Sequence, residues 1–594
     1  MSSDSIDVVH FSDASCILCH ETIASLDEAQ LLDRSVRRIK VVQCPPLCLL
    51  CTQSPQARTW CHLSCLSILI WTLGDDNVPN HDDLLSYGTL TRPRWKERRL
   101  AIYNDGNSVE QCTSALRKMF SVKLVDRMPR EIVLGIVKLL GPVCLSAIRE
   151  FRSHISALRR KPLGAKISLD PSRVVYRTTF RFRGNSYISM ISNQYDGREN
   201  LRKLRGRLRT DRCRVAVSFD EIGVRNIRIF GPGASTIPAD GSPWYYITDS
   251  SSQVVFEGFT DGLILRDIRR KFVSNFYDSF LWDTTNPPTI NIKNFFSASS
   301  TGASHSRFRF VPFNAEAYML TVHCRSQKIL GICAHDLVDL HPSCGICDIY
   351  VREKNVQRLC FPVNAREKIQ GIWIRTPKLV STKDRSIIVE TTRSRVRTFG
   401  LYSRINHDGF EFHSLLGRTD GFVDGIYYNA LEGRCDYVTE LGVICSSANQ
   451  SLAEVVTLPN LPAFYDSPTR SLDWYLSAAP LDNLRSLRFS YDEKSPSCTG
   501  VLLVYHDGSQ DVLGQLFWDR LISSKDISRE NTRYYNITMG KLHCVQWKEV
   551  DSDVEPLSDN SNGDNWRSIP ETGTIRWWFG RLGNRIVIDP VSLT

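Results

Sequence analysis

Eight cysteine and histidine side chains near the start of the chain have the residue types and the spacing of metal ligands. Seven of the 19 cysteines fall within the first 65 residues of this 594-residue chain. Zinc binds four Cys or His ligands in a tetrahedron, and a Cys-x2-Cys turn or a His-x2-Cys pair presents two of them together. The cluster therefore predicts structural zinc in a module over residues 1–75. Its candidate ligands are Cys16, Cys19, Cys44, Cys48, Cys51, Cys61, His62 and Cys65.

The order of these pairs resembles treble-clef and cross-braced fingers, and the Trp60-x-His62-x2-Cys65 piece is similar to the matching piece of PHD fingers. In cross-braced fingers the first and third pairs share one ion. The resemblance therefore implies two ligand sets, the first being Cys16, Cys19, His62 and Cys65. The second would be Cys44, Cys48, Cys51 and Cys61, although the fourth cysteine pair of such folds is missing here. The alternative is a set of buried free thiols.

A closed four-ligand zinc site leaves no position for a substrate water. The module therefore indicates a scaffold and not metal catalysis. A helix over residues 66–72 is expected to complete it. A second spacing, His341-x2-Cys344-x2-Cys347 with Cys360 beyond, could also bind metal, but it lies among predicted strands. Isolated thiols commonly fill the cores of such regions, and we favour that interpretation for it.

Residues 76–165 carry helical signals. Pro129 stands at a suitable first helical position, and Ile132, Ile136 and Leu140 repeat at the spacing of one helical face. Residues 128–160 resemble the opening of an F-box. That resemblance implies docking on a Skp-type adaptor of a cullin ubiquitin ligase. The favoured interpretation is an ordinary helical hairpin packed between domains, and the F-box is the alternative.

Residues 198–214 hold eight basic side chains among seventeen, which could neutralise phosphates of a nucleic acid. The run contains no aromatic residue for base stacking. A solvated charged surface is the favoured interpretation, and nucleic-acid binding is an alternative.

From about residue 172 the helical period gives way to short β-branched and aromatic runs between Gly, Pro, Asn and Asp turns. We expect β-rich domains at 172–310 and 311–594, built as antiparallel sandwiches or prisms. The predicted strands include 173–182, 226–230, 245–248, 369–375, 387–392 and 501–505. A loose repeat of Gly followed by Ile or Val predicts a bulge or a close backbone approach at each glycine. These glycines are Gly331, Gly371, Gly425 and Gly500.

Three phrases, at 367–375, 416–427 and 484–518, resemble strand phrases of jacalin-type β-prism lectins. The resemblance implies a three-part antiparallel prism whose Gly-rich loops bind sugars, although a clear Gly-x-x-x-Asp loop is missing. The whole order of cysteine module, F-box-like helix and β-rich body resembles uncharacterised proteins of filamentous fungi.

The bulk composition agrees with several globular domains: 42% hydrophobic, 23% charged and a formal net charge of +10. The N-terminus lacks a signal-peptide pattern, and the apolar run at 66–73 is too short for a bilayer span. The cysteines should then be thiols or metal ligands in a cytoplasmic or nuclear protein. With no phosphate loop, nucleophile elbow or His-Glu-x-x-His motif, the sequence predicts a non-catalytic adaptor. The alternatives are a lectin-like or a nucleic-acid-binding protein.

Overall fold

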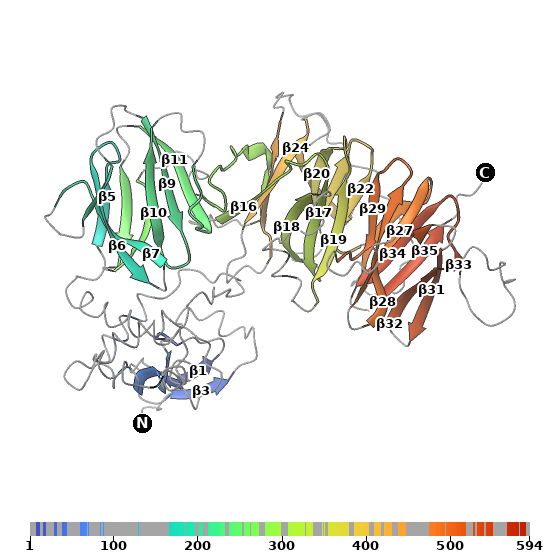
Figure 1. The fold of residues 1–594 in the computed structure, drawn as a ribbon, viewed down its shortest axis with the longest axis horizontal. Helices are drawn as coiled ribbons and strands as arrows, with labels where there is room; N and C mark the ends of the chain where they lie inside the picture. Colours follow the sequence, from blue (N-terminus) through green and yellow to red (C-terminus); the bar gives the residue numbers. More distant parts are fainter. Residues whose placement is uncertain are drawn as a thin grey trace. The chain divides into compact units, whose positions relative to one another are not determined.

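A computed structural model provides the structure of the chain (Figure 1). The residues it describes are 7–11, 16–18, 29–31, 39–43, 60–63, 65–67, 69, 84, 87, 129, 165–182, 185–195, 201–205, 212–231, 237–251, 255–261, 263–271, 280–298, 307–326, 328–336, 347, 350, 355–378, 385–402, 409–416, 421–429, 437–446, 474–492, 495–517, 527–528, 532–539, 542–549, 567–580 and 583–589. Strands dominate these residues, so the prediction of a mainly β protein is confirmed. All six predicted strands lie on observed ones.

The chain divides into two compact units. Unit 1 comprises Met1–Pro287, Ser304–Arg307 and Glu432–Arg434, and unit 2 comprises Pro288–Ala303, Phe308–Leu431 and Cys435–Thr594. The finer division into four domains stays a prediction. The F-box-like segment 128–160 lies outside the described residues apart from Pro129, which is exposed. In the part of the chain that is described, no helix combines the length and the hydropathy of a membrane span.

Unit 1 begins with two small strand pairs, β1 with β3 in parallel and β2 with β4 antiparallel. Three larger groupings follow, in the orders β13-β12-β5, β7-β6-β8 and β10-β9-β11-β14. The strands of this unit are β1 (Asp7–Phe11), β2 (Ala29–Leu31), β3 (Ile39–Gln43), β4 (Trp60–His62), β5 (Ala165–Leu169), β6 (Val175–Phe182), β7 (Asn185–Ser192), β8 (Arg202–Arg205), β9 (Arg212–Phe219), β10 (Val224–Phe230), β11 (Trp244–Ser251), β12 (Phe256–Thr260), β13 (Leu265–Arg270) and β14 (Leu281–Trp282).

Two hairpins of unit 1 use the same turn chemistry. Asp220, after β9, accepts hydrogen bonds from the backbone N–H groups two and three residues ahead, and Asp261, after β12, does the same. Each aspartate also pairs with an arginine five residues on, Arg225 or Arg266. Because a short aspartate side chain can satisfy the backbone of a tight turn, this spacing sets where the chain reverses.

The described strands of unit 2 form five mainly antiparallel groupings, in the orders β16-β24-β25-β15, β18-β17-β19, β22-β21-β20-β23, β29-β28-β27-β30 and β26-β34-β35-β32-β31-β33. The last holds one parallel contact, between β32 and β35. The elements are η4 (Ile292–Asn294), β15 (Phe295–Ser297), β16 (Arg307–Pro312), β17 (Tyr318–Arg325), β18 (Lys328–Asp336), β19 (Gln357–Val363), β20 (Ile369–Pro377), β21 (Ser386–Thr391), β22 (Val396–Phe399), β23 (Phe410–Leu416), β24 (Val423–Asn429), β25 (Glu440–Cys445), β26 (Trp474–Pro480), β27 (Leu484–Asp492), β28 (Ser495–Tyr505), β29 (Gln510–Gly514), β30 (Ile527–Ser528), β31 (Thr532–Met539), β32 (Leu542–Glu549), β33 (Arg567–Ser568), β34 (Thr574–Gly580) and β35 (Gly583–Asp589).

The four repeated glycines lie where the strand register shifts, as the sequence predicts. An added Cβ at Gly371 would lie 2.1 Å from the Trp373 ring, and one at Gly500 would lie 2.3 Å from the backbone oxygen of Gln515. Glycine is therefore required at these positions because a neighbouring ring or backbone occupies the space of a side chain.

One large apolar core runs through unit 2. Ile332, Ile372 and Ile426, each following one of the repeated glycines, are at most 1% exposed and share this core. It continues into the C-terminal strands, where Trp547 and Trp577 stack with ring centroids 6.2 Å apart. A smaller cluster that includes Met319 and Cys360 packs strands β17 and β19 against β28 and β29.

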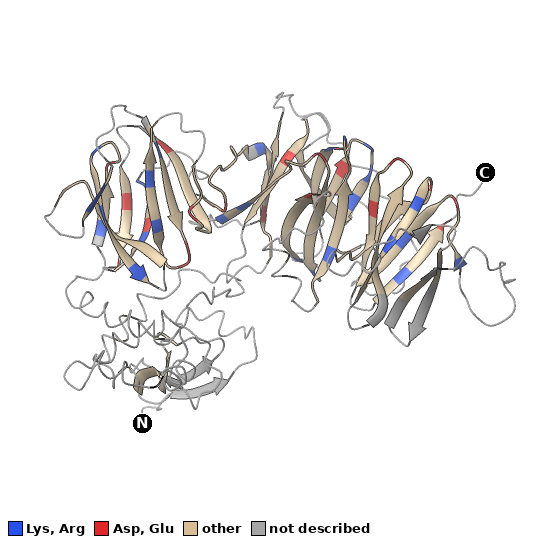
Figure 2. Cartoon of the chain, viewed as in Figure 1, with Lys and Arg blue, Asp and Glu red and all other residues tan. Residues whose placement is uncertain are grey.

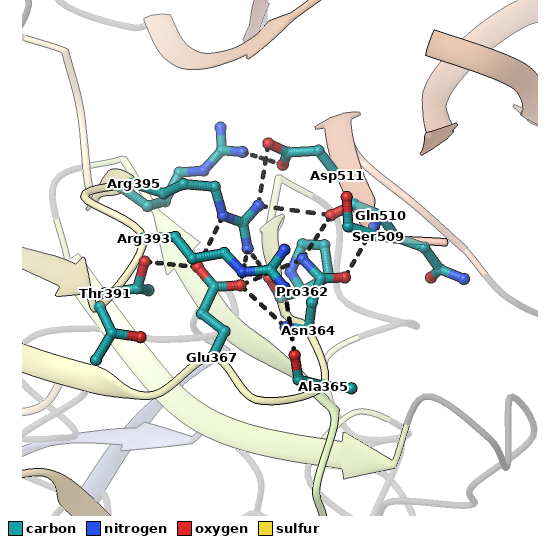
Figure 3. Close-up of polar contacts among 12 residues, drawn as sticks. Pro362, Asn364, Ala365, Glu367, Thr391, Arg393, Arg395, Ser509, Gln510 and Asp511 are labelled. Carbon is teal, nitrogen blue, oxygen red and sulfur yellow. Dashed lines mark hydrogen bonds and ion pairs between the residues drawn. The ribbon is translucent and has the colours of Figure 1, made fainter. Parts of the chain in front are cut away.

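A buried network of charges joins the loop before β20 to the strands β22 and β29 (Figure 3). The Glu367 carboxylate, 0% exposed, accepts hydrogen bonds from Arg395 Nε at 2.9 Å, Arg395 Nη2 at 2.8 Å and Thr391 Oγ1 at 2.5 Å. Arg395 Nη1 also donates to Asp511 Oδ2 at 3.2 Å, and Arg397 Nη2 donates to Asp511 Oδ1 at 2.8 Å. Each buried charge thus has a partner, which makes the burial tolerable.

Burial alone would raise the pKa of the Glu367 carboxyl. The hydrogen bonds and the charge of Arg395, with the hydrogen bond from Thr391, outweigh burial and hold that pKa below its usual range. Glu367 therefore stays ionised and keeps the network intact at neutral pH.

Candidate metal centre

Strand β4 brings two of the predicted zinc ligands beside a third. Trp60, at the start of β4, forms an isolated β-bridge with Cys16, and its carbonyl accepts the Ile17 N–H at 2.9 Å. His62 ends β4, and residues 63, 65–67 and 69 are helical, in agreement with the predicted helix. Because the chain turns from strand to helix directly after His62, Cys65 lies on the same side as His62.

The ligand atoms of Cys16, His62 and Cys65 all lie within 4.8 Å of one another, and we call these three residues the N-terminal group. Cys65 Sγ is 3.8 Å from His62 Nδ1. Cys16 Sγ accepts backbone N–H groups of Leu18 at 3.4 Å and of His62 at 3.3 Å. Two backbone N–H groups thus point at one sulfur, and the thiolate is the form of a cysteine that binds metal. The residues present therefore fit a zinc ion.

The other predicted ligands divide into two cases. Cys61 is fully buried, with its Sγ 3.9 Å from Cys16 Sγ, and it donates to the carbonyl of His62 at 3.3 Å. Cys61 thus lies next to the first predicted ion's ligands. The remaining four predicted ligands lie outside the described residues, and they are Cys19, Cys44, Cys48 and Cys51. The division into two ions therefore stays a prediction.

The second spacing singled out in the sequence is only partly described, because His341 and Cys344 lie outside the described residues. Cys360 faces Thr321 across the ladder, with Sγ 3.8 Å from the Thr321 hydroxyl, and belongs to the small apolar cluster of unit 2. Burial raises the pKa of the Cys360 thiol. Cys360 is therefore a core thiol, as expected. Cys347 instead lies beside two histidines.

Sequence reasoning missed the partners of Cys347. Its Sγ is 3.1 Å from His335 Nε2, 3.3 Å from His323 Nε2 and 3.7 Å from Cys333 Sγ. We call His323, Cys333, His335 and Cys347 the sheet-face group. The one local signal was Cys333-x-His335 within a strand, since alternate residues of a strand share a face.

The basic run 198–214 is described at two places. Arg202 and Lys203 are exposed on β8. On β9, Arg214 Nε donates to Asp249 Oδ1 at 2.9 Å, and this hydrogen bond raises the pKa of Arg214. Both basic and acidic positions are scattered over the described strands (Figure 2). Part of the run thus neutralises a carboxylate of its own chain.

No protein-family model and no curated protein sequence matches this chain.

Proposed function

We propose that this protein is a non-catalytic interaction protein of the cytoplasm or nucleus, in which a zinc-stabilised N-terminal module and the following helical segment recruit one partner and the β-rich body recognises another. The observation that carries the proposal is the convergence of Cys16, His62 and Cys65 within 4.8 Å. Their Cys and His chemistry suits a closed, structural zinc site. With Cys19 as fourth ligand, such a site would stabilise a recognition module.

The F-box-like segment 128–160 gives the class of the partner that the N-terminal module and the helical segment would recruit. This class is the Skp-type adaptors. We expect the purified chain to bind a purified Skp-type adaptor, measured by calorimetry. Ile132→Asp places a charge on the predicted docking face and should abolish that binding. Arg130→Ala, which changes a neighbouring polar position, should leave it unchanged. Binding that survives Ile132→Asp would contradict the F-box interpretation.

The proposed zinc ion of the N-terminal group has its own test. Elemental analysis of purified wild-type protein should show zinc, and Cys65→Ala should lower the zinc content by about one equivalent because three ligands bind far more weakly than four. Zinc content that does not change in Cys65→Ala would overturn the assignment. Robust turnover of a small molecule without any stable protein partner would overturn the adaptor proposal as a whole.

A carbohydrate-binding function is the second candidate. It is supported by three sets of antiparallel strands in unit 2, each of which holds one Gly-Ile strand: the sheets β18-β17-β19 and β22-β21-β20-β23, and the strands β16-β24-β25-β15 of a larger sheet. Their isoleucines share one core, as expected for a three-part prism. Phe422, 37% exposed beside the positive-φ Gly421, could stack on the apolar face of a sugar ring.

A glycan array probed with the full chain tests this candidate. Binding should fall about tenfold in Phe422→Ala, equivalent to about 1.4 kcal/mol. It should persist in Phe259→Ala, which removes another exposed phenylalanine, located in unit 1. If the wild-type chain binds no glycan on the array, the lectin interpretation is wrong and the adaptor proposal is unaffected.

A further inference from the structure

The sheet-face group combines four buried metal-ligating side chains from two strands and one connection. His323 is 1% exposed, Cys333 3%, and His335 and Cys347 are each 8% exposed. The ligand atoms of His323, Cys333 and Cys347 all lie within 4.8 Å of one another. His335 reaches Cys347 Sγ at 3.1 Å. All four residues lie within unit 2 and are far along the chain from residues 16–65.

Strand pairing explains why these side chains meet. His323 on β17 pairs with Gly331, and Cys333 on β18 pairs with Thr321. His323 and Thr321 are two residues apart and share a face, so Cys333 lies diagonally across from His323 on that same face. His335 is the next residue along β18 on this face. Because Gly331 has no side chain, the space beside His323 stays open to a fourth group.

That fourth group is Cys347, from the connection between β18 and β19. Tyr350, three residues later, holds this connection to the sheet: its hydroxyl donates to the Leu330 carbonyl at 2.9 Å, and its ring lies 5.0 Å from the ring of His323. The cysteine is thereby placed over two histidines and a second cysteine.

The spacing of the His323, Cys333 and Cys347 ligand atoms matches three corners of a tetrahedral zinc site, and His335 approaches this set through its contact with Cys347. Zn–S bonds of about 2.3 Å and Zn–N bonds of about 2.0–2.1 Å give S···S edges of about 3.8 Å and S···N edges of about 3.5 Å. The observed Sγ···Sγ distance between Cys333 and Cys347 is 3.7 Å, and the His323 Nε2 to Cys347 Sγ distance is 3.3 Å. Zn²⁺ with two thiolates and two neutral imidazoles carries no net charge, so the filled site suits a buried position.

We propose that His323, Cys333 and Cys347, with His335 as fourth ligand, bind a structural zinc ion that fastens the β18–β19 connection to the face of the sheet β18-β17-β19. Four protein ligands close the coordination sphere and leave no place for a substrate water, so the site is structural. It is independent of the proposed zinc of the N-terminal group.

Elemental analysis of the full chain in four forms tests the proposal. Cys347→Ser should lower the zinc content by about one equivalent relative to wild type, and Cys65→Ala should lower it by about one equivalent as well. The double variant should lose about two, because distant sites are independent. Cys360→Ser is the matched control: it replaces a buried cysteine on the same sheet and should retain all zinc.

A spectroscopic measurement covers the case in which Cys347→Ser fails to fold. Loss of the N-terminal ligand Cys65 leaves the sheet-face group intact, so Cys65→Ala refilled with Co²⁺ should show the visible bands of tetrahedral cobalt with thiolate ligands. His335→Gln in that background should change these bands.

Three results would overturn the proposal. The first is unchanged zinc content in Cys347→Ser. The second is a Cys333–Cys347 disulfide in the purified protein, detected as a mass two hydrogens below that of the dithiol. The third concerns the fourth ligand: full zinc in His335→Gln, together with loss of zinc in Cys344→Ser, would remove His335 from the site.

Discussion

The two Cys/His groups of this protein have similar chemistry but opposite surroundings. In the N-terminal group, His62 and Cys65 are three residues apart and Cys16 reaches them through a single β-bridge. In the sheet-face group, the ligands come from β17, β18 and a connection, on a sheet that belongs to the large core of unit 2. Zinc bound to the N-terminal group would therefore contribute to the folding of its module. Zinc bound to the sheet-face group would anchor the connection that carries Cys347.

This difference predicts different consequences of metal loss. A module as small as residues 1–75 has a small core, so the proposed zinc would supply much of its folding free energy. Strands β17 and β18 are already held by their ladder and by apolar contacts on the opposite face. Loss of metal there should free the connection and leave the sheet in place.

The largest expected effect is local unfolding of the N-terminal module. Cys65→Ala should abolish hydrogen-exchange protection within residues 1–75, since structural zinc contributes an apparent 10–16 kcal/mol, roughly, in small modules. Exchange in the strands of unit 2 should not change. Cys213→Ala, at another buried cysteine of unit 1, should retain the protection. Protection that survives Cys65→Ala would show that the module folds by its apolar contacts alone.

The next effect concerns the buried charge network of Glu367, Arg395, Arg397 and Asp511 in unit 2. Glu367→Ala leaves Arg395 partly buried without its principal partner and should cost about 3–5 kcal/mol in the free energy of unfolding, measured by denaturant titration. Asp507→Asn removes the charge pair of Asp507 with Arg393, whose side chains are 61% and 44% exposed, and keeps an oxygen that can accept the hydrogen bonds from Ser509. That change should cost under about 1 kcal/mol. Equal losses in the two variants would contradict a structural role for the network.

The strand register of unit 2 depends on close backbone contacts at its glycines. Replacing one of these glycines should have a smaller effect on the free energy of unfolding. Gly500→Ala would place a Cβ 2.3 Å from the Gln515 oxygen and should lower the free energy of unfolding by about 1–3 kcal/mol. At Gly231 of unit 1 no atom lies within 4 Å of an added Cβ. Thermal unfolding of Gly231→Ala should therefore match wild type. If Gly500→Ala were as stable as wild type, the bulge at this position would be able to relax.

The smallest effect is a dependence on pH. Because the pKa of Glu367 is lower in the folded protein than in the unfolded chain, its carboxylate stabilises unit 2 above the unfolded pKa of about 4.3. This contribution is lost as the pH falls through the folded pKa. Denaturant titrations between pH 7 and pH 3 should thus show a flatter acid loss for Glu367→Gln than for wild type. Parallel curves would show that Glu367 does not contribute to the acid sensitivity.

Local patterns in the sequence determined the strands, the bulges and part of the N-terminal group. Alternating β-branched and aromatic residues predicted six strands that the structure contains, and Gly371 and Gly500 marked register shifts. His62-x2-Cys65 predicted a shared ligand site because a strand-to-helix turn brings residues three apart together. Each of these signals lies within a few residues, where covalent geometry and local sterics decide the outcome.

Tertiary structure alone decided the sheet-face group and the charge network. His323, Cys333 and Cys347 are separated by ten and fourteen residues, and they meet only because of the register of β17 with β18 and the path of the connection. Glu367 and Asp511 share Arg395 across more than a hundred residues. Such encounters depend on which strands pair and on which face each side chain lies, and a one-residue slip in register would reverse the face.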